Sequence, residues 1–134
     1  MKRYYAVVDT NVIVSALLTR NQQSPPVALL DLVVKKRIIP VYNEEILDEY
    51  REVLSRTKFH FNEDRIVAAL NAIRVGLCVD RTPVDWKFPD EDDVVFYEVA
   101  MSIDEAYLVT GNTRHYPPVN KVVTPAEMLK IITE

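Results

Sequence analysis

Short runs of apolar, β-branched and aromatic residues alternate along the chain with segments in which apolar residues recur at helical spacing. The strand-like runs are residues 4–8, 38–42, 77–79, 106–110 and 119–123. The helical patterns occupy residues 12–18, 24–36, 43–56, 62–76, 94–103 and the segment from 124 onward. Such an alternation is typical of parallel sheets, so the pattern predicts a single α/β domain over residues 1–134.

Signals at the ends of these segments support the same division. Asn43 and Asn62 are good N-caps for the helices that follow them, because a short polar side chain can accept a backbone N–H. Thr124 and Glu127 are spaced as a capping box that opens the last helix. Pro40 cannot donate a hydrogen bond to a neighbouring strand, so it predicts an edge strand or the start of a strand.

Composition excludes several classes of function. Hydrophobic residues make up 49% of the chain and charged residues 27%, which is typical of a folded globular protein. The chain has 16 basic and 20 acidic residues, a net charge of -4, so a strongly basic nucleic-acid coat is excluded while a local basic patch is not. The two glycines, Gly76 and Gly111, cannot form a Walker loop or a GxGxxG turn.

The cysteine and histidine content and the lengths of the apolar stretches exclude further classes of protein. One cysteine and two histidines exclude a cysteine-based zinc site and leave little for a histidine-rich one. No apolar stretch approaches the roughly 20 residues of a membrane span, and the first apolar run is too short for a signal peptide. We therefore expect a cytoplasmic protein without a membrane partner.

Polar residues collect near the ends of the predicted strands. Asp9 follows the first strand directly, and Asn112 comes just after the fourth. Asp90 and Asp93 lie at the start of the fifth predicted helix, and Glu49 lies at the border of the apolar stripe of the third. Ligands of parallel α/β sheets bind beyond the carboxyl ends of the strands, so we expect these side chains near one site.

Carboxylates gathered at one sheet edge favour a divalent metal ion. Mg²⁺ and Mn²⁺ prefer oxygen ligands, and such ions can activate a water for phosphodiester cleavage. Each acid also has a simpler interpretation: Asp9 as a helix N-cap, the acids at 90–93 as partners of a helix dipole, and Glu49 as a surface acid. Glu45, one turn earlier, is the alternative acid of that helix. Spacing alone leaves these interpretations open.

Short segments in order along the chain resemble the motifs of PIN-domain proteins. They are residues 8–18, 43–59, 90–93 followed by Ala100, 108–116 and 123–127. The second segment resembles that of a PIN subgroup described as toxin components of toxin–antitoxin pairs. The resemblance implies a three-layer α/β/α sandwich with a central, mostly parallel sheet, and metal-dependent endonuclease activity, usually on RNA.

The resemblance also assigns roles by position. Asp9, Glu49 and Asp93 correspond to the family's metal-binding acids, with Mg²⁺ or Mn²⁺ as the cofactor, and Asp90 matches a further acid common in the subgroup. Asn112 completes the predicted catalytic set, at a position where many relatives have aspartate; the amide removes one negative charge and weakens any second metal site. The supporting polar residues are Thr10, Asn11 and Thr110.

The expected function is a metal-dependent endoribonuclease that is the toxin of a toxin–antitoxin pair, with RNA as substrate, an antitoxin protein as partner and a homodimer as the assembly. Candidates for RNA contact are Arg114, His115 and Arg20, because RNA phosphates require positive charge. The alternatives are a non-catalytic RNA- or protein-binding module of the same fold and a housekeeping RNA-processing nuclease. A haloacid-dehalogenase-type phosphatase is disfavoured, since Asn11 stands where that chemistry needs a second aspartate.

Overall fold

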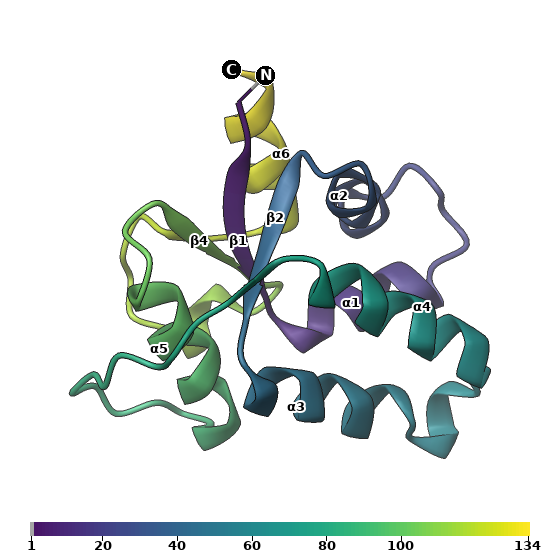
Figure 1. Ribbon diagram of the computed structural model, residues 1–134, viewed down its shortest axis with the longest axis horizontal. Helices are drawn as coiled ribbons and strands as arrows, with labels where there is room; N and C mark the ends of the chain where they lie inside the picture. Colours follow the sequence, from purple (N-terminus) through teal and green to yellow (C-terminus); the bar gives the residue numbers. More distant parts are fainter. Residues whose placement is uncertain (1) are drawn as a thin grey trace.

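A parallel sheet forms the centre of the molecule (Figure 1). Within residues 2–134, which the computed structural model describes, the sheet has five strands in the order β3-β2-β1-β4-β5. All neighbouring pairs run parallel. The strands are β1 (Tyr4–Val8), β2 (Ile38–Tyr42), β3 (Leu77–Cys78), β4 (Ala106–Val109) and β5 (Val122–Val123).

Helices cover both faces of this sheet, which confirms the predicted three-layer α/β/α sandwich. The helices are α1 (Thr10–Leu18), α2 (Pro25–Val34), α3 (Glu44–Leu54), α4 (Glu63–Arg74), α5 (Val94–Met101) and α6 (Pro125–Thr133). Helix α5 packs on β1, β2 and β4, while α2 packs on β2 and against α1 and α6. No helix in the described part of the chain is both long and apolar enough to cross a lipid bilayer.

The capping predictions are confirmed. The Asn43 side chain accepts a hydrogen bond from the Ile46 N–H at 2.9 Å, and α3 begins at the next residue, Glu44. Asn62 caps α4 in the same way. At the start of α6, the Glu127 N–H donates to Thr124 Oγ1 at 3.1 Å and the Thr124 N–H donates to the Glu127 carboxylate at 2.8 Å. These bonds satisfy backbone donors that a helix leaves unpaired.

The prediction from Pro40 is wrong, because β2 lies inside the sheet between β1 and β3. Pro40 is tolerated there because the pairing with β3 begins only at Val41, opposite Leu77. The backbone also approaches closely at this point: a Cβ on Gly76 would lie 2.0 Å from the Pro40 carbonyl oxygen. Glycine is therefore required at residue 76 by space.

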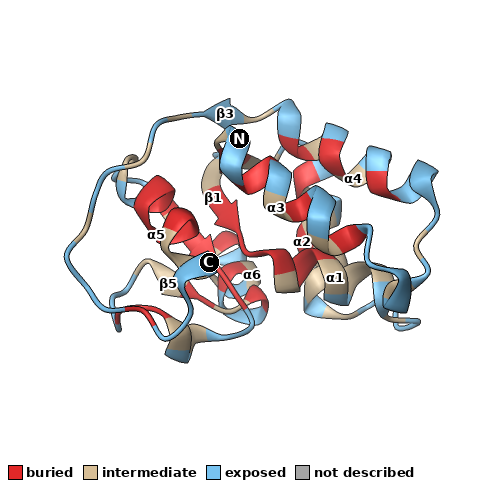
Figure 2. Ribbon diagram, turned by 90° about the horizontal axis from the view of Figure 1, so that it is seen from below, coloured by how far each residue is buried: buried red, intermediate tan, exposed pale blue. Residues whose placement is uncertain are grey.

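The buried residues lie along the sheet and on the inner faces of the helices (Figure 2). Helix α5 is buried from Val95 to Ala100, including the acid Glu98. The register of β1 and β4 matters most for the site, because Val8 pairs with Val109 at the carboxyl ends of both strands. The residues that follow these two strands, Asp9 and Thr110, are consequently neighbours.

Candidate functional site

Asp9 is fixed at the carboxyl end of β1 by a set of hydrogen bonds. Its backbone N–H donates to the Val109 carbonyl at 2.9 Å. Its Oδ2 accepts from the Thr110 hydroxyl at 2.8 Å, the Tyr116 hydroxyl at 2.9 Å and the Asn11 amide at 3.1 Å. Asp9 occupies the N-cap position of α1, yet its side chain makes no capping bond. The simple N-cap interpretation is therefore wrong for this residue.

Burial makes the Asp9 carboxylate costly. The residue is 5% exposed, and this burial raises its pKa above the usual value, although the hydrogen bonds from Thr110, Tyr116 and Asn11 oppose the rise. A buried carboxylate is normally neutralised or paired with a cation. Asp9 is held by neutral donors, so its charge is not balanced by any of these contacts.

Glu49 reaches the same region from α3. The adjacent Tyr50 is fully buried, and its hydroxyl donates to the Val8 carbonyl, which ties α3 to the end of β1. Glu49 is half-buried, and its pKa is raised first by burial and then by the negative charge of Asp92. Glu45 instead forms an ion pair with Arg81 at 2.7 Å.

Asp93 lies at the end of a short 3-10 turn, Glu91–Asp93, that leads into α5. Its Oδ2 is 3.1 Å from Nδ1 of His115, which lies in a second short turn after β4. The pKa of Asp93 is raised to about 6 by burial and by the charges of Asp9 and Asp90, against the lowering effect of His115. His115 thus contacts a carboxylate of the site.

These acids line one cleft of about 180 Å³. The acidic cleft, as we call it, is lined by Asp9, Thr10, Glu49, Val53, Arg56, Asp90, Asp92, Asp93 and Phe96. Over residues 2–134, no group of three or more His, Cys, Asp or Glu side chains is drawn together closely enough to hold a metal ion. The carboxylates therefore share a cleft without converging on one point, as expected of like charges that repel each other.

The donor atoms of the acidic cleft fit a hard divalent cation. Carboxylate oxygens are the ligands that Mg²⁺ and Mn²⁺ prefer. Thr10 adds a hydroxyl that is buried and has no hydrogen-bond partner within the described residues. A buried hydroxyl without a partner is costly, and an ion or its hydration water would satisfy it.

Of the remaining predicted residues, Asp90 lines the acidic cleft, whereas Asn112 and Arg20 do not. Asp90 is exposed, and its side chain accepts from the Asp92 N–H at 2.9 Å, so it caps the short 3-10 turn Glu91–Asp93. Asn112 is exposed and does not line the acidic cleft; its N–H donates to Thr110 Oγ1 at 3.0 Å. Arg20 lies beyond the far end of α1, which at 1.5 Å per residue is about 13 Å long.

Tyr116 is the residue of the site that the sequence analysis did not single out. It is buried, and its hydroxyl lies 2.9 Å from the Asp9 carboxylate. Its own pKa is raised by burial and by the negative charges of Asp9 and Asp93, so it stays protonated and donates. Tyr116 directly follows the short turn Thr113–His115, and in the sequence nothing distinguishes it from a tyrosine of the hydrophobic core.

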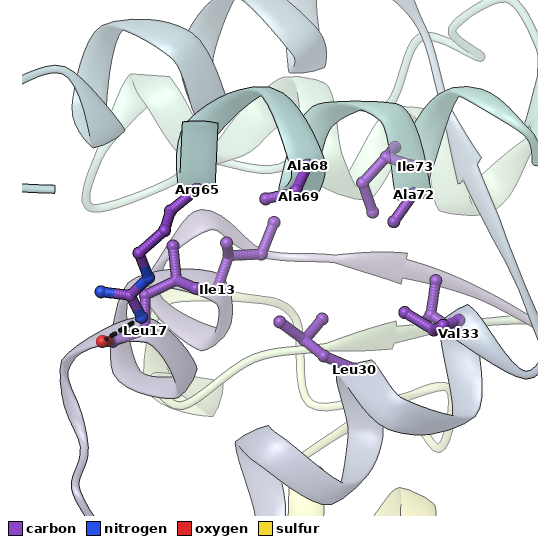
Figure 3. Close-up of a pocket in the computed structure, with 10 residues that line it drawn as sticks. Ile13, Leu17, Leu30, Val33, Arg65, Ala68, Ala69, Ala72 and Ile73 are labelled. Atoms are coloured by element: carbon purple, nitrogen blue, oxygen red, sulfur yellow. Dashed lines mark hydrogen bonds between the residues drawn. The ribbon is translucent and has the colours of Figure 1, made fainter. Parts of the chain in front are cut away.

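A second hollow, of about 260 Å³, lies between α1, α2 and α4 (Figure 3). This apolar groove is lined by Ile13, Leu17, Leu30, Val33, Val34, Arg65, Ala68, Ala69, Ala72 and Ile73. Its space arises from the three alanines of α4, which face the larger side chains of α1 and α2. The groove shares no lining residue with the acidic cleft and contains no carboxylate.

Comparison with known proteins identifies the family. A model described as the PIN domain matches residues 5–114. This chain belongs to the PIN domain family. PIN domains are generally nucleases and typically use divalent metals. The matched range contains Asp9, Glu49, Asp93 and Asn112 and stops just before Tyr116.

A relative of this PIN domain protein occurs in Methanocaldococcus jannaschii. The chain is 31% identical over 140 residues to an uncharacterized protein of that organism, and the match covers 92% of this chain and 88% of that protein. No solved structure gives a significant match to the chain.

Proposed function

We propose that the chain is a Mg²⁺- or Mn²⁺-dependent endoribonuclease whose active site is the acidic cleft. The observation that supports this proposal is that Asp9, Glu49 and Asp93, which come from three separate elements, all line one cleft. Burial raises the pKa of each of these acids, and neighbouring negative charges raise the pKa of Glu49 and Asp93 further. Titratable groups perturbed in this way, in a cleft of a nuclease-type fold, are typical of catalytic sites.

Asp9, Glu49 and Asp93 would hold the ion, with the Thr10 hydroxyl within its hydration shell. When bound, a divalent ion supplies Lewis-acid activation of water and stabilises negative charge on the phosphodiester. Tyr116, Thr110 and Asn11 would act as positioning residues, because their three hydrogen bonds restrict the rotation of the Asp9 carboxylate.

Three further residues complete the proposed site. His115 would hold Asp93 in place through the 3.1 Å contact. Asn112 lies in the exposed segment after β4, outside the acidic cleft. Its amide would contact the RNA substrate. Arg56 also lines the acidic cleft; it pairs with Glu52 at 2.8 Å and would contact an RNA phosphate from there.

We further propose that this nuclease is the toxin of a toxin–antitoxin pair. This role is supported by the resemblance of residues 43–59 to the toxin subgroup, and it implies an antitoxin protein that covers the acidic cleft and a homodimeric toxin. Expression of the protein should slow growth, and Asp9→Ala should relieve the effect. Harmless expression of an active nuclease would instead indicate housekeeping RNA processing. Light scattering of the purified protein tests the homodimer.

The test of the nuclease is cleavage of labelled single-stranded RNA by purified protein in Mg²⁺, Mn²⁺ or EDTA. We expect cleavage in the two metals, none in EDTA, and none from Asp9→Asn, which keeps the size of the side chain. Equal cleavage by wild type and Asp9→Asn would indicate a contaminating nuclease and remove the proposal. Metal binding without cleavage would favour the non-catalytic module.

A further inference from the structure

A third hollow, of about 430 Å³, shares no lining residue with the acidic cleft, but one of its lining residues, Tyr116, contacts Asp9 of that cleft. It is lined by Trp86, Thr113, Arg114, Tyr116, Pro117, Pro118, Val119 and Val122. Tyr116 forms part of this wall, while its hydroxyl donates to Asp9 in the acidic cleft. We call it the tryptophan hollow. Its volume falls within the roughly 300–1,000 Å³ of small-ligand sites.

Trp86 is held in place but remains exposed. Its ring stands edge-on to Phe88 at a centroid distance of 4.8 Å, and the buried Phe88 packs in turn against Tyr116 at 6.1 Å. The indole nevertheless keeps 39% of its surface exposed. A large aromatic side chain that packs against other aromatic rings and is still partly exposed is typical of sites where nucleic-acid bases stack.

The loop that carries Trp86 is anchored to α5. The Arg81 guanidinium donates to the buried Glu98 carboxylate at 2.7 Å, and the Val84 N–H donates to the same carboxylate at 3.0 Å. These charge-assisted bonds restrain the loop just before Trp86. The platform is therefore partly preorganised, which lowers the entropic cost of binding a ligand on it.

Arg114 supplies a positive charge at the wall of the tryptophan hollow. It is exposed, and across residues 2–134 it takes part in no ion pair. The next residue, His115, contacts Asp93 in the acidic cleft. In an unpaired nucleotide, the phosphate can contact an arginine while the base stacks on an aromatic ring next to it.

We infer that the tryptophan hollow binds one unpaired nucleotide of the RNA, next to the phosphodiester cleaved in the acidic cleft. The base stacks on Trp86 and the phosphate contacts Arg114. This subsite rests on the proposed ribonuclease function. It favours single-stranded RNA because a paired base is already stacked between its neighbours and cannot reach the indole.

Trp86 is the sole tryptophan of the chain, so its fluorescence reports the subsite directly in the unmodified protein. A mixed-sequence single-stranded RNA oligonucleotide is titrated in EDTA, which separates binding from cleavage. We expect saturable quenching of the fluorescence. Arg114→Gln should weaken binding and lower the slope of log affinity against log salt by about 0.7, the value for one phosphate contact.

Cleavage kinetics give a second readout. Trp86→Ala should raise KM for RNA roughly 5- to 100-fold with kcat nearly unchanged, and Trp86→Phe should lie between it and wild type. The matched control is Val75→Ala: Val75 is 68% exposed and precedes the amino end of β3, at the opposite edge of the sheet. It should leave KM unchanged. Melting temperatures confirm that each variant is folded.

The outcomes separate the subsite from the nuclease. Saturable quenching together with the raised KM supports the subsite. RNA cleavage with unchanged fluorescence and an unchanged KM in Trp86→Ala overturns the subsite and leaves the nuclease standing. Quenching without cleavage in Mg²⁺ or Mn²⁺ supports the subsite and overturns the nuclease. Neither quenching nor cleavage overturns both.

Discussion

The two ends of helix α1 lie in opposite surroundings. At its amino end, Asp9 and Thr10 line the acidic cleft, where carboxylates from several elements meet. Toward its other end, Ile13 and Leu17 line the apolar groove, where the only charged side chain among the lining residues is Arg65. Arg65 donates to the Leu17 carbonyl at 2.8 Å and so caps the groove (Figure 3).

This difference separates residues that stabilise the fold from residues that cost stability. The groove is a gap between three helices, which the small alanine side chains do not fill completely. Its lining residues are apolar apart from Arg65, like those of the hydrophobic core. In the acidic cleft, burial raises the pKa of Asp9, Glu49 and Asp93, and like charges add to the rise for Glu49 and Asp93. Ionisable groups that are kept in an unfavourable environment are typical of catalytic sites. Substitutions in the acidic cleft should therefore lower RNA cleavage, and substitutions in the apolar groove should change the stability of the fold.

The largest expected effect distinguishes two acids of the same helix. Glu49→Gln should lower RNA cleavage by at least about 100-fold, because it removes a charge from the proposed metal site. The matched control is Glu45→Gln, which breaks only the partly exposed ion pair with Arg81 and should change cleavage less than about twofold. Equal losses in both variants would show that Glu49 has no special role.

The next effect concerns the positioning of Asp9. Tyr116→Phe removes the hydroxyl that donates to Oδ2 and should lower metal affinity and cleavage by about 10- to 100-fold. The free energy of unfolding should fall by only about 1 kcal/mol, the value of one hydrogen bond. Calorimetric Mn²⁺ titration and urea unfolding measure the two quantities. An unchanged Mn²⁺ affinity would argue against a positioning role.

A smaller effect is expected in the pH dependence of stability without divalent metal. The pKa of Asp93 is about 6 in the folded protein and 3.8 for a free carboxyl, so the folded state binds more protons between these values. Folding stability should therefore fall as the pH rises from 4 to 7. Asp93→Asn removes the part of this dependence that comes from Asp93 and should gain about 1–2 kcal/mol on wild type by pH 7. The measurement is the free energy of unfolding of both proteins between pH 4 and 7. The same change with pH in both proteins would contradict the prediction.

The smallest effect belongs to the apolar groove. Ala69→Leu should fill part of the hollow and raise the free energy of unfolding by about 0.5–1 kcal/mol. Cleavage should stay at the wild-type rate, because the groove shares no residue with the acidic cleft. Thermal melts measure the stability and the RNA assay measures the cleavage rate. A strong loss of cleavage would show that the apolar groove and the acidic cleft are not independent.

The fold could be predicted largely because its signals are local. The Asn43 and Thr124 caps and the buried strands act over a few residues, and the structure follows them. Pro40 misled the prediction because its effect depends on where β3 starts, a property of the neighbouring strand. The hydrogen bond between Tyr116 and Asp9 joins residues far apart in the chain, so no local pattern contains it.

The candidate site could be predicted in part for the same reason. Asp9 and Thr110 follow strands that pair in parallel, so topology alone brings them together. Glu49 was selected over Glu45 by its position on the helix, and the structure directs Glu45 to Arg81 instead. Trp86 lies in a loop without periodicity, and its proximity to Arg114 depends entirely on the tertiary fold.

The proposed nuclease activity depends on binding of a divalent cation in the acidic cleft. Calorimetric titration of Mn²⁺ into metal-free protein tests it most directly, with Asp9→Asn as the cleft variant and Ala69→Leu as the groove variant. We expect saturable binding by wild type and Ala69→Leu, weakened at least about 10-fold in Asp9→Asn. Absence of binding by wild type, or equal binding by Asp9→Asn, would contradict the account.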